Sequence, residues 1–190
     1  MMLALQIYLF LGLVLHKVVW EVLGRSSSEK PKENRSAGLL LIKAVKIFIL
    51  VGILVQIWVP ENYIFPIATD STGVRIAGVI IYTIGLATAL AARFQLGENW
   101  ANIETGQVLT KQEVVANGIY RYVRHPIYVG DLLLLFGLEL ALNSWLLLGV
   151  LILAPVVMKK AIGEEQMLAA ELPGYDAYRD RSKRFIPFVY

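Results

Sequence analysis

The sequence predicts an all-α integral membrane protein with about five transmembrane segments. Of the 190 residues, 57% are hydrophobic and 17% are charged, and the mean hydropathy is +0.60. Soluble domains carry roughly 25% charged residues, so the chain is short of residues for a water-exposed surface. The apolar residues also gather in long runs, which are separated by segments rich in lysine and arginine. We therefore expect one membrane domain over residues 1–190.

Three spans are expected within residues 1–92, because a membrane-crossing helix needs about 20 apolar residues. They run from Met1 to Leu23, from about Leu39 to Val59 and from about Val74 to Ala92. The first run also has the position of a signal peptide. No basic region precedes it, however, and no cleavage site of small residues follows it, so we interpret it as a span.

The apolar run of residues 132–158 is expected to form a membrane hairpin. As one helix, its 27 residues would be about 40 Å long, whereas the hydrocarbon core is about 30 Å thick. Basic residues such as Arg124 and Lys159 flank both ends, and the positive-inside rule places both flanks in the cytoplasm. The two ends then lie on the same side, with a turn at Asn143-Ser144 between them. Glu139 is the one charged residue of the run.

The remaining segments give a consistent orientation. Residues 24–36 are basic, as are a linker over residues 93–131 and a tail over residues 159–190, so all three are expected in the cytoplasm. Residues 60–73 hold acidic residues and no lysine or arginine, so they are expected outside. The residues capable of chemistry therefore lie mainly on the cytoplasmic side, in the linker and the tail.

Composition argues against several kinds of site. The chain has no cysteine and two histidines, His16 and His125, which lie far apart in the sequence. Thiolate chemistry is thus excluded, and no metal site is expected. The glycine-rich motifs that bind dinucleotides or nucleoside triphosphates are absent, and no nucleic acid partner is expected.

The linker carries a dense group of polar and aromatic residues. Asn117-Gly118 is a strong turn signal, and Pro126 fits the first turn of a new helix, with His125 just before it. By composition alone, tyrosines and arginines of this kind are common as anchors at the membrane interface. The order of the residues, rather than their kind, favours a functional site.

The tail predicts a helix over about residues 158–172, with Glu164 and Glu165 side by side. Pro173-Gly174 then breaks the helix, and a basic segment follows. A solvated helix and a basic tail on anionic lipid headgroups would explain the same composition.

The linker and the tail together hold an ordered set of motifs. The set consists of Gly118-Ile119-Tyr120 and Arg124-His125-Pro126-Ile127-Tyr128-Val129-Gly130, followed after the apolar run by Glu164-Glu165, Tyr175-x-x-Tyr178 and Arg181. This order resembles the isoprenylcysteine carboxyl methyltransferase family over about residues 93–188. Membrane phospholipid N-methyltransferases share the pattern more loosely.

The resemblance implies that S-adenosylmethionine binds on the cytoplasmic side, between the linker and the tail. It implies a cofactor site made by Glu164 or Glu165 together with Gly118, Tyr120, His125, Pro126, Tyr128 and Gly130. It also implies that Arg124 and Arg181, with Tyr178, bind an acidic substrate group and orient it for methyl transfer. A guanidinium fork suits a carboxylate in this role.

Carried onto this chain, the resemblance implies carboxyl O-methylation of a lipophilic small molecule or a prenylated substrate that arrives through membrane lipids. Two alternatives remain open. A phospholipid or small-molecule N- or S-methyltransferase would use the same cofactor site with another acceptor. A non-catalytic membrane scaffold would use its basic face to contact anionic lipid, and charge-preserving changes such as Arg124→Lys would then be harmless. The oligomeric state does not follow from the sequence.

Overall fold

The computed structural model describes residues 2–25, 37–60, 66–99 and 112–187. The basic loop at residues 26–36 and the middle of the linker, residues 100–111, lie outside the described residues. The expected all-α fold is confirmed for the described ranges. The helices are α1 (Met2–Arg25), α2 (Ala37–Trp58), α3 (Thr72–Leu96), α4 (Pro126–Ala141), α5 (Leu147–Glu171) and α6 (Tyr175–Arg181), with two short 3-10 helices, η2 (Gly97–Asn99) and η4 (Gly118–Arg121).

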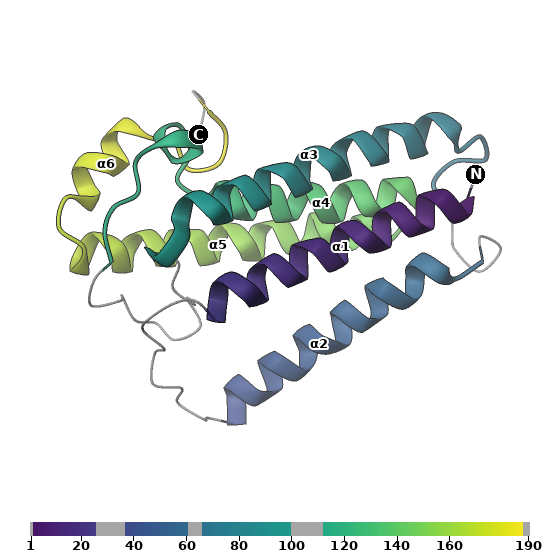
Figure 1. Cartoon of the computed structure of the whole chain (residues 1–190), viewed down its shortest axis with the longest axis horizontal. Coiled ribbons are helices and arrows are strands. Elements are labelled where there is room, and N and C mark those ends of the chain that lie inside the picture. Colours follow the sequence, from purple (N-terminus) through teal and green to yellow (C-terminus); the bar gives the residue numbers. More distant parts are fainter. Residues whose placement is uncertain (1, 26–36, 61–65, 100–111, 188–190) are drawn as a thin grey trace.

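The five long helices lie alongside one another, and α6 and the linker cap one end of the bundle (Figure 1). Among the described residues, α1 and α3 are long and apolar enough to cross a membrane, and α2 contributes a shorter apolar stretch, Ala44–Trp58. Large apolar side chains point outward, for example Phe48 in α2 at 78% exposure and Ile152 in α5 at 73%. An exposed apolar surface of this extent is typical of helices that face lipid.

The tightest packing in the bundle is between α3 and α4, where glycines bring the two backbones together. A Cβ atom at Gly85 would collide with the backbone of Leu134, and a Cβ atom at Gly137 would collide with the backbone of Tyr82. Small residues allow this close approach between membrane helices, where van der Waals contact drives association. α3 and α4 therefore form the rigid centre of the fold.

The buried core lies between this pair of helices and α1. It contains Leu9 and Leu13 of α1, Tyr82 of α3 and Leu138 of α4, each less than 10% exposed. The Tyr82 hydroxyl donates a hydrogen bond of 2.7 Å to the Leu9 carbonyl. The phenol thus joins the packing of apolar groups without leaving its own polar atom unpaired.

The chain reverses direction between α4 and α5, close to the expected turn at Asn143-Ser144. Asn143 adopts a left-handed conformation with φ of 57°, which asparagine tolerates better than most residues. Its side chain accepts a hydrogen bond from the Ala68 N–H at 3.1 Å and donates one to the Ala68 carbonyl at 2.9 Å. Nearby, Glu139 accepts a hydrogen bond of 2.8 Å from Gln56 of α2. The turn is thereby tied to the segment before α3 and to α2.

The helix expected over residues 158–172 begins earlier than the sequence suggested. α5 runs without interruption from Leu147 to Glu171, with Pro155 inside it. The apolar part that leaves the turn and the polar part that carries Glu164 and Glu165 are consequently one element. This continuity fixes the orientation of the two glutamates relative to the bundle.

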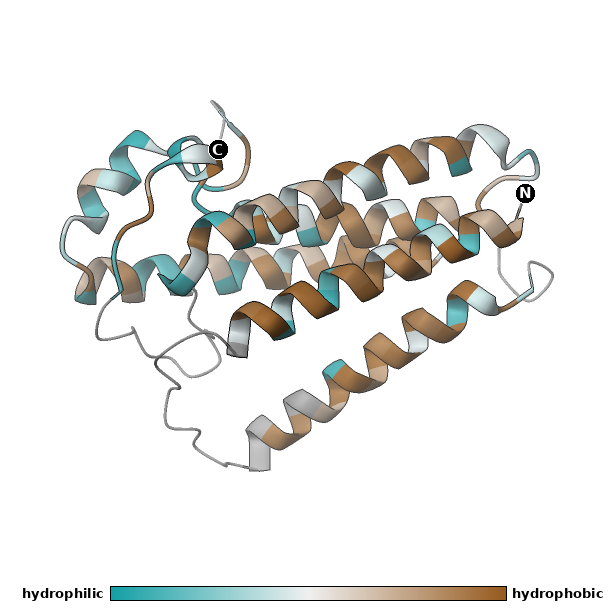
Figure 2. Ribbon diagram, viewed as in Figure 1, coloured by the Kyte–Doolittle hydropathy of each residue, from teal (hydrophilic) through white to brown (hydrophobic). Residues whose placement is uncertain are grey.

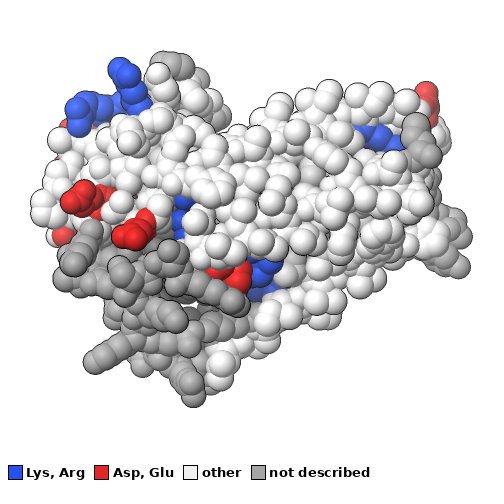
Figure 3. All heavy atoms as spheres, viewed as in Figure 1, with Lys and Arg blue, Asp and Glu red and all other residues white. Residues whose placement is uncertain are grey.

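Polar residues concentrate at the end of the bundle that carries α6. The long helices are mostly apolar along their length, whereas α6 is largely hydrophilic (Figure 2). On the face drawn in Figure 3, many of the charged side chains lie at this end, and others lie on the lower middle of the bundle and at its opposite end. The start of α4 and the end of α5 also meet here, so this end is the candidate location of a functional site.

Candidate functional site

A pocket lies at this polar end, between the start of α4, the last turns of α5, α6 and the linker. The pocket and its open mouth together contain about 820 Å³ of space not filled by atoms, solvent at the mouth included. The described residues that line it are Leu96, Asn99, Gln112, Glu113, Val114, Val115, Tyr120, Arg124, His125, Ile127, Tyr128, Glu164, Met167, Leu168, Leu172, Tyr175 and Tyr178.

The wall of the pocket is held together by a short backbone pairing between the linker and the segment after α6. The Arg124 N–H donates to the Lys183 carbonyl at 2.8 Å, and the His125 N–H donates to the Arg184 carbonyl at 3.2 Å. In return, the Lys183 N–H donates to the Tyr122 carbonyl at 3.0 Å. Two segments far apart in the sequence are thereby fixed side by side.

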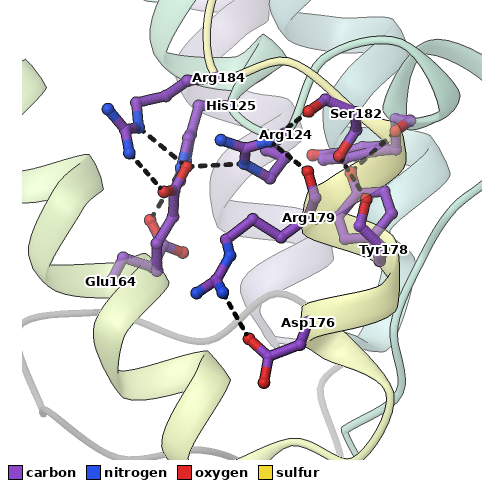
Figure 4. Close-up of polar contacts among 10 residues, drawn as sticks. Arg124, His125, Glu164, Asp176, Tyr178, Arg179, Ser182 and Arg184 are labelled. Atoms are coloured by element: carbon purple, nitrogen blue, oxygen red, sulfur yellow. Dashed lines mark hydrogen bonds and ion pairs between the residues drawn. The ribbon is translucent and has the colours of Figure 1, made fainter.

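A buried ion cluster lies at this junction, where the side chains of Arg124, His125 and Arg184 converge (Figure 4). Its centre is the buried Glu165 of α5. Its carboxylate accepts hydrogen bonds from Arg124 Nε at 2.8 Å and Arg184 Nη2 at 2.9 Å, and it lies 3.1 Å from His125 Nε2. Burial raises the pKa of this carboxyl, but the hydrogen bonds from His125, Arg184 and Arg124 outweigh burial and hold the pKa well below its usual range. Glu165 is therefore ionised, and its hydrogen bonds hold α5 to the start of α4 and to the tail.

Arg124 extends the same cluster to α6. Its Nη1 donates to the Arg179 carbonyl at 2.9 Å and to the Ser182 carbonyl. Two carbonyls at the end of α6 are satisfied in this way, as helix ends require. With Nε on Glu165 and Nη1 on these carbonyls, most of the Arg124 fork is already engaged within the protein.

Glu164, next to Glu165, faces the pocket instead of the cluster. Its Oε2 atom is buried and makes no well-formed hydrogen bond within the described residues, and His125 Nδ1 lies 3.6 Å away. Burial raises the pKa of the Glu164 carboxyl, and His125 and the Tyr128 hydroxyl lower it only in part. A buried polar atom without a partner is rare and calls for an explanation, and a polar ligand group in the pocket would supply one.

Four tyrosines form much of the remaining wall: Tyr120, Tyr128, Tyr175 and Tyr178. The Tyr178 hydroxyl donates 2.8 Å to the Tyr120 carbonyl, and burial raises the pKa of Tyr178 to about 12. Tyr128 stacks on His125 with ring centroids 5.5 Å apart. Its buried hydroxyl makes no well-formed hydrogen bond within the described residues, but it lies close enough to Glu164 for the two groups to interact. The pocket thus presents neutral aromatic faces around one buried carboxyl.

The other residues of the predicted site lie outside the lining. Gly118 turns the chain with φ of 53°, and a Cβ atom there would collide with the Gln95 side chain. Pro126 begins α4, as expected, and Gly130 packs against Ala89 of α3. Arg181 is exposed, and its Nε donates to the Ala177 carbonyl of its own helix at 3.0 Å. The structure therefore brings Tyr120, Arg124, His125, Tyr128, Glu164 and Tyr178 to the pocket, but not Arg181.

Sequence reasoning missed Arg184, which completes the ion cluster. It is one of several basic residues in the tail, and nothing in their spacing distinguishes it. The expectation of no metal site stays a prediction, and no group of three or more potential metal ligands occurs in the described part of the chain.

The chain resembles known proteins in sequence and in fold. The model of the phospholipid methyltransferase family matches residues 74–172, from α3 to the end of α5. The chain is 29% identical over 102 residues to the protein-S-isoprenylcysteine O-methyltransferase of Schizosaccharomyces pombe, covering 52% of this chain and 43% of that protein. It is also 29% identical over 121 residues to the nickel-cobalt-cadmium resistance protein NccN of Alcaligenes xylosoxydans xylosoxydans, covering 62% of this chain and 54% of that protein.

The fold resembles a solved structure of the eukaryotic intramembrane Ras methyltransferase ICMT. The two superpose with a TM-score of 0.61 at 20% sequence identity, covering 93% of this chain and 63% of that chain. At this identity the likeness concerns the fold alone. The chain spans about half the length of the curated relatives described above.

Proposed function

The chain belongs to the phospholipid methyltransferase family, and we propose that it transfers a methyl group from S-adenosylmethionine to a lipophilic acceptor in the membrane. The observation that carries the proposal is the pocket itself. Glu164 Oε2 and the Tyr128 hydroxyl are buried there without a well-formed hydrogen bond among the described residues, and aromatic faces surround them. This arrangement suits a ligand that combines positive charge, hydrogen-bond donors and a flat ring.

The donor set fits the implied cofactor group by group. A glutamate accepts from an ammonium or a ribose hydroxyl in a charge-assisted hydrogen bond, and Glu164 is available for this. Tyrosine faces stabilise a sulfonium cation and pack against adenine, which assigns these tasks to Tyr120, Tyr128, Tyr175 and Tyr178. His125 is oriented by Glu165 and keeps the Tyr128 ring in place through stacking.

The chemistry needs little beyond positioning. When bound, S-adenosylmethionine would supply an electrophilic methyl group on sulfur, and the pocket residues would hold the acceptor in line with it. Holding two reactants in line contributes much of the rate of such a reaction. The ion cluster on Glu165 serves this purpose, because it locks the linker, α5 and α6 into one wall of the pocket.

The acceptor has two candidates. Three curated relatives are named protein-S-isoprenylcysteine O-methyltransferase, which favours the carboxylate of an isoprenylcysteine type of substrate. The name of the matching family favours a phospholipid amine instead, and the engagement of Arg124 with Glu165 and α6 also favours an acceptor that needs no guanidinium. Both candidates are amphiphiles that reach the pocket from the bilayer.

For the membrane topology we propose five crossings, with α4 and α5 as the hairpin and the pocket in the cytoplasm. α4 has 16 residues and is about 24 Å long, which is short for a hydrocarbon core of about 30 Å. The turn after it and the flanking residues complete the crossing. In this arrangement the external end holds the turn at Asn143, and the cytoplasmic end holds α6.

Calorimetric titration of the purified protein with S-adenosylhomocysteine tests the proposal. We expect saturable binding with one site per chain, followed by transfer of labelled methyl from S-adenosylmethionine to a member of a panel of prenylcysteines, phospholipids and thiols. Folded protein that binds neither S-adenosylhomocysteine nor S-adenosylmethionine would overturn the proposal and leave the membrane scaffold as the better explanation.

A further inference from the structure

A histidine and an aspartate meet between α1 and α4, outside the ion cluster. His16 Nε2 lies 2.9 Å from Asp131 Oδ1, and the two side chains are 20% and 39% exposed. The His16 ring also stacks on Trp20, with centroids 4.0 Å apart and planes 20° apart. The pair thus has a fixed ring orientation and remains accessible, and the cofactor site described above makes no use of it.

The helical register places the pair next to the pocket. Asp131 follows Ile127 by four residues and Tyr128 by three, and both of these line the pocket. Residues at these spacings share a helix face, and one turn advances about 5.4 Å. His16 is therefore held about one turn beyond the pocket wall, toward the apolar part of the bundle.

The hydrogen bond to Asp131 assigns the protonation state of the neutral ring. A carboxylate accepts, so Nε2 carries the proton and Nδ1 keeps its lone pair. Within the described residues, the Asp131 bond is the one hydrogen bond of the His16 side chain. Nδ1 is thus free to accept a proton, and Asp131 stabilises the imidazolium that would form, as in other histidine–carboxylate pairs.

We propose that His16 and Asp131 accept the proton of the methyl acceptor, which is therefore a lipophilic amine or thiol. The proposal rests on the proposed function and specifies its substrate class. The acceptor nitrogen or sulfur forms a bond to the methyl carbon as the bond from that carbon to the sulfonium sulfur breaks. The bonding pair stays on sulfur as the thioether, and the N–H or S–H proton moves to His16 Nδ1.

A carboxylate acceptor would not need the His16–Asp131 pair as a proton acceptor. It is already anionic at neutral pH and carries no proton to remove. It would need a free cation for orientation, whereas Arg124, a guanidinium of the described lining, already binds Glu165 and two carbonyls. The geometry of both sites therefore favours an acceptor that loses a proton.

Several charged groups lie around the His16–Asp131 pair. Lys17 and Glu21 lie near His16 on α1, and Lys46 of α2 is in electrostatic contact with Lys17 and with Lys160 of α5. On the pocket side, the groups are Tyr128 of α4 and Glu164 of α5. Asp131 is the group that contacts the imidazole directly.

The test compares His16→Gln and Asp131→Asn with a matched control, Tyr8→Phe. Glutamine keeps an N–H donor for Asp131 but takes up no proton, and asparagine removes the charge that orients the ring. Tyr8 also links α1 to another helix, through a 2.6 Å hydrogen bond to Thr83 of α3, so the control removes an interhelical bond of α1 without touching the pair.

We expect both variants to bind S-adenosylhomocysteine like the wild type and to lose about 100-fold or more in kcat for an amine or thiol, the usual size of general-base catalysis. In the wild type, kcat should rise with pH and level off, and this inflection should disappear in both variants. Tyr8→Phe should keep rate and inflection.

The proposal is overturned if both variants retain the wild-type rate and pH profile, or if a carboxylate is the acceptor that becomes methylated. The wild-type profile and the acceptor panel decide the matter even where a variant fails to fold. Absence of S-adenosylhomocysteine binding to the wild type would instead refute the proposed function, which separates the two failures.

Discussion

The two ends of the helix bundle both bury polar groups, but these groups differ in how fully they are hydrogen-bonded. At the end that carries the turn after α4, Glu139 accepts from Gln56, Arg75 donates to the Ala141 carbonyl at 3.1 Å, and Asn143 pairs with Ala68 at both of its side-chain atoms. At the end that carries α6, Glu165 is equally well paired, yet the neighbouring Glu164 keeps a buried oxygen without a well-formed hydrogen bond in the described residues. The contrast separates polar groups that are fully hydrogen-bonded within the fold from one whose hydrogen bonding is incomplete.

The largest expected effect is the loss of the ion cluster in Glu165→Ala. The change leaves Arg124, His125 and Arg184 without their shared carboxylate, and removal of one partner from a buried ion pair costs about 3–5 kcal/mol. Thermal unfolding in detergent, followed by circular dichroism, should report a much lower midpoint. A midpoint close to that of the wild type would mean that the cluster does not hold the wall of the pocket.

The same residue gives a pH dependence whose sign follows from its environment. The Glu165 carboxyl has a pKa below its usual range in the folded protein, so it stabilises the fold at pH values above about 4.3, its unfolded pKa. This stabilisation is lost as the pH falls through the lower folded pKa. Glu165→Ala should lack this acid-induced loss, so the stability curves of variant and wild type should converge at low pH.

The next effect in size is a loss of cofactor affinity in Glu164→Gln. Hydrogen bonds to charged groups contribute about 1.5–3 kcal/mol, which corresponds to roughly 10- to 100-fold in Kd. Burial raises the pKa of Glu164, so its ionised form costs stability as the pH rises above the unfolded value. Titration with S-adenosylhomocysteine should therefore give a weaker Kd, while the unfolding midpoint at pH 7 stays equal or rises.

Glu139→Gln is the matched control at the other end of the bundle. It is the same substitution at a buried glutamate, but this glutamate is paired with Gln56 and lies far from the pocket. Effects of distant sites are independent, so the Kd for S-adenosylhomocysteine should change less than twofold. If Glu139→Gln weakened binding as much as Glu164→Gln, the distinction between the two ends would fail.

The variants with the smallest expected effect on activity are single cysteines, which test the side of the membrane that each end of the bundle faces. The chain has no cysteine, so single cysteines are specific labels, and Asp70 and Lys183 are exposed positions at opposite ends. Asp70→Cys should react with an impermeant maleimide in intact cells, and Lys183→Cys only after permeabilisation. Both should keep wild-type methyl transfer, and labelling of both from outside would refute the proposed five crossings.

The sequence predicted the long helices better than the site. Length and hydropathy alone placed α1, α2 and α3 to within a few residues of their observed bounds, because an apolar run has few other ways to satisfy its backbone in lipid. Pro126 marked the start of α4 for a local reason, the absence of an N–H that the first turn does not need. These features depend on neighbours in the sequence.

The roles of individual polar residues depended on packing instead. Glu164 and Glu165 are adjacent, and only the rotation of α5 relative to α4 decides that one faces the pocket and the other the arginines. The pairing of His16 with Asp131 joins residues 115 positions apart. Arg184 reaches the ion cluster through a backbone pairing that no sequence motif predicts. Such contacts follow from the tertiary arrangement and have no local signature.

The backbone pairing of the linker with Lys183 and Arg184 also sets an order of events during synthesis. These two residues follow α1 to α6 along the chain, so a ribosome makes those helices before it makes Lys183 and Arg184. The wall of the pocket and the ion cluster are completed only afterwards, by a segment that docks onto an already inserted bundle. A nascent chain thus forms its long helices before it can complete the wall of the pocket.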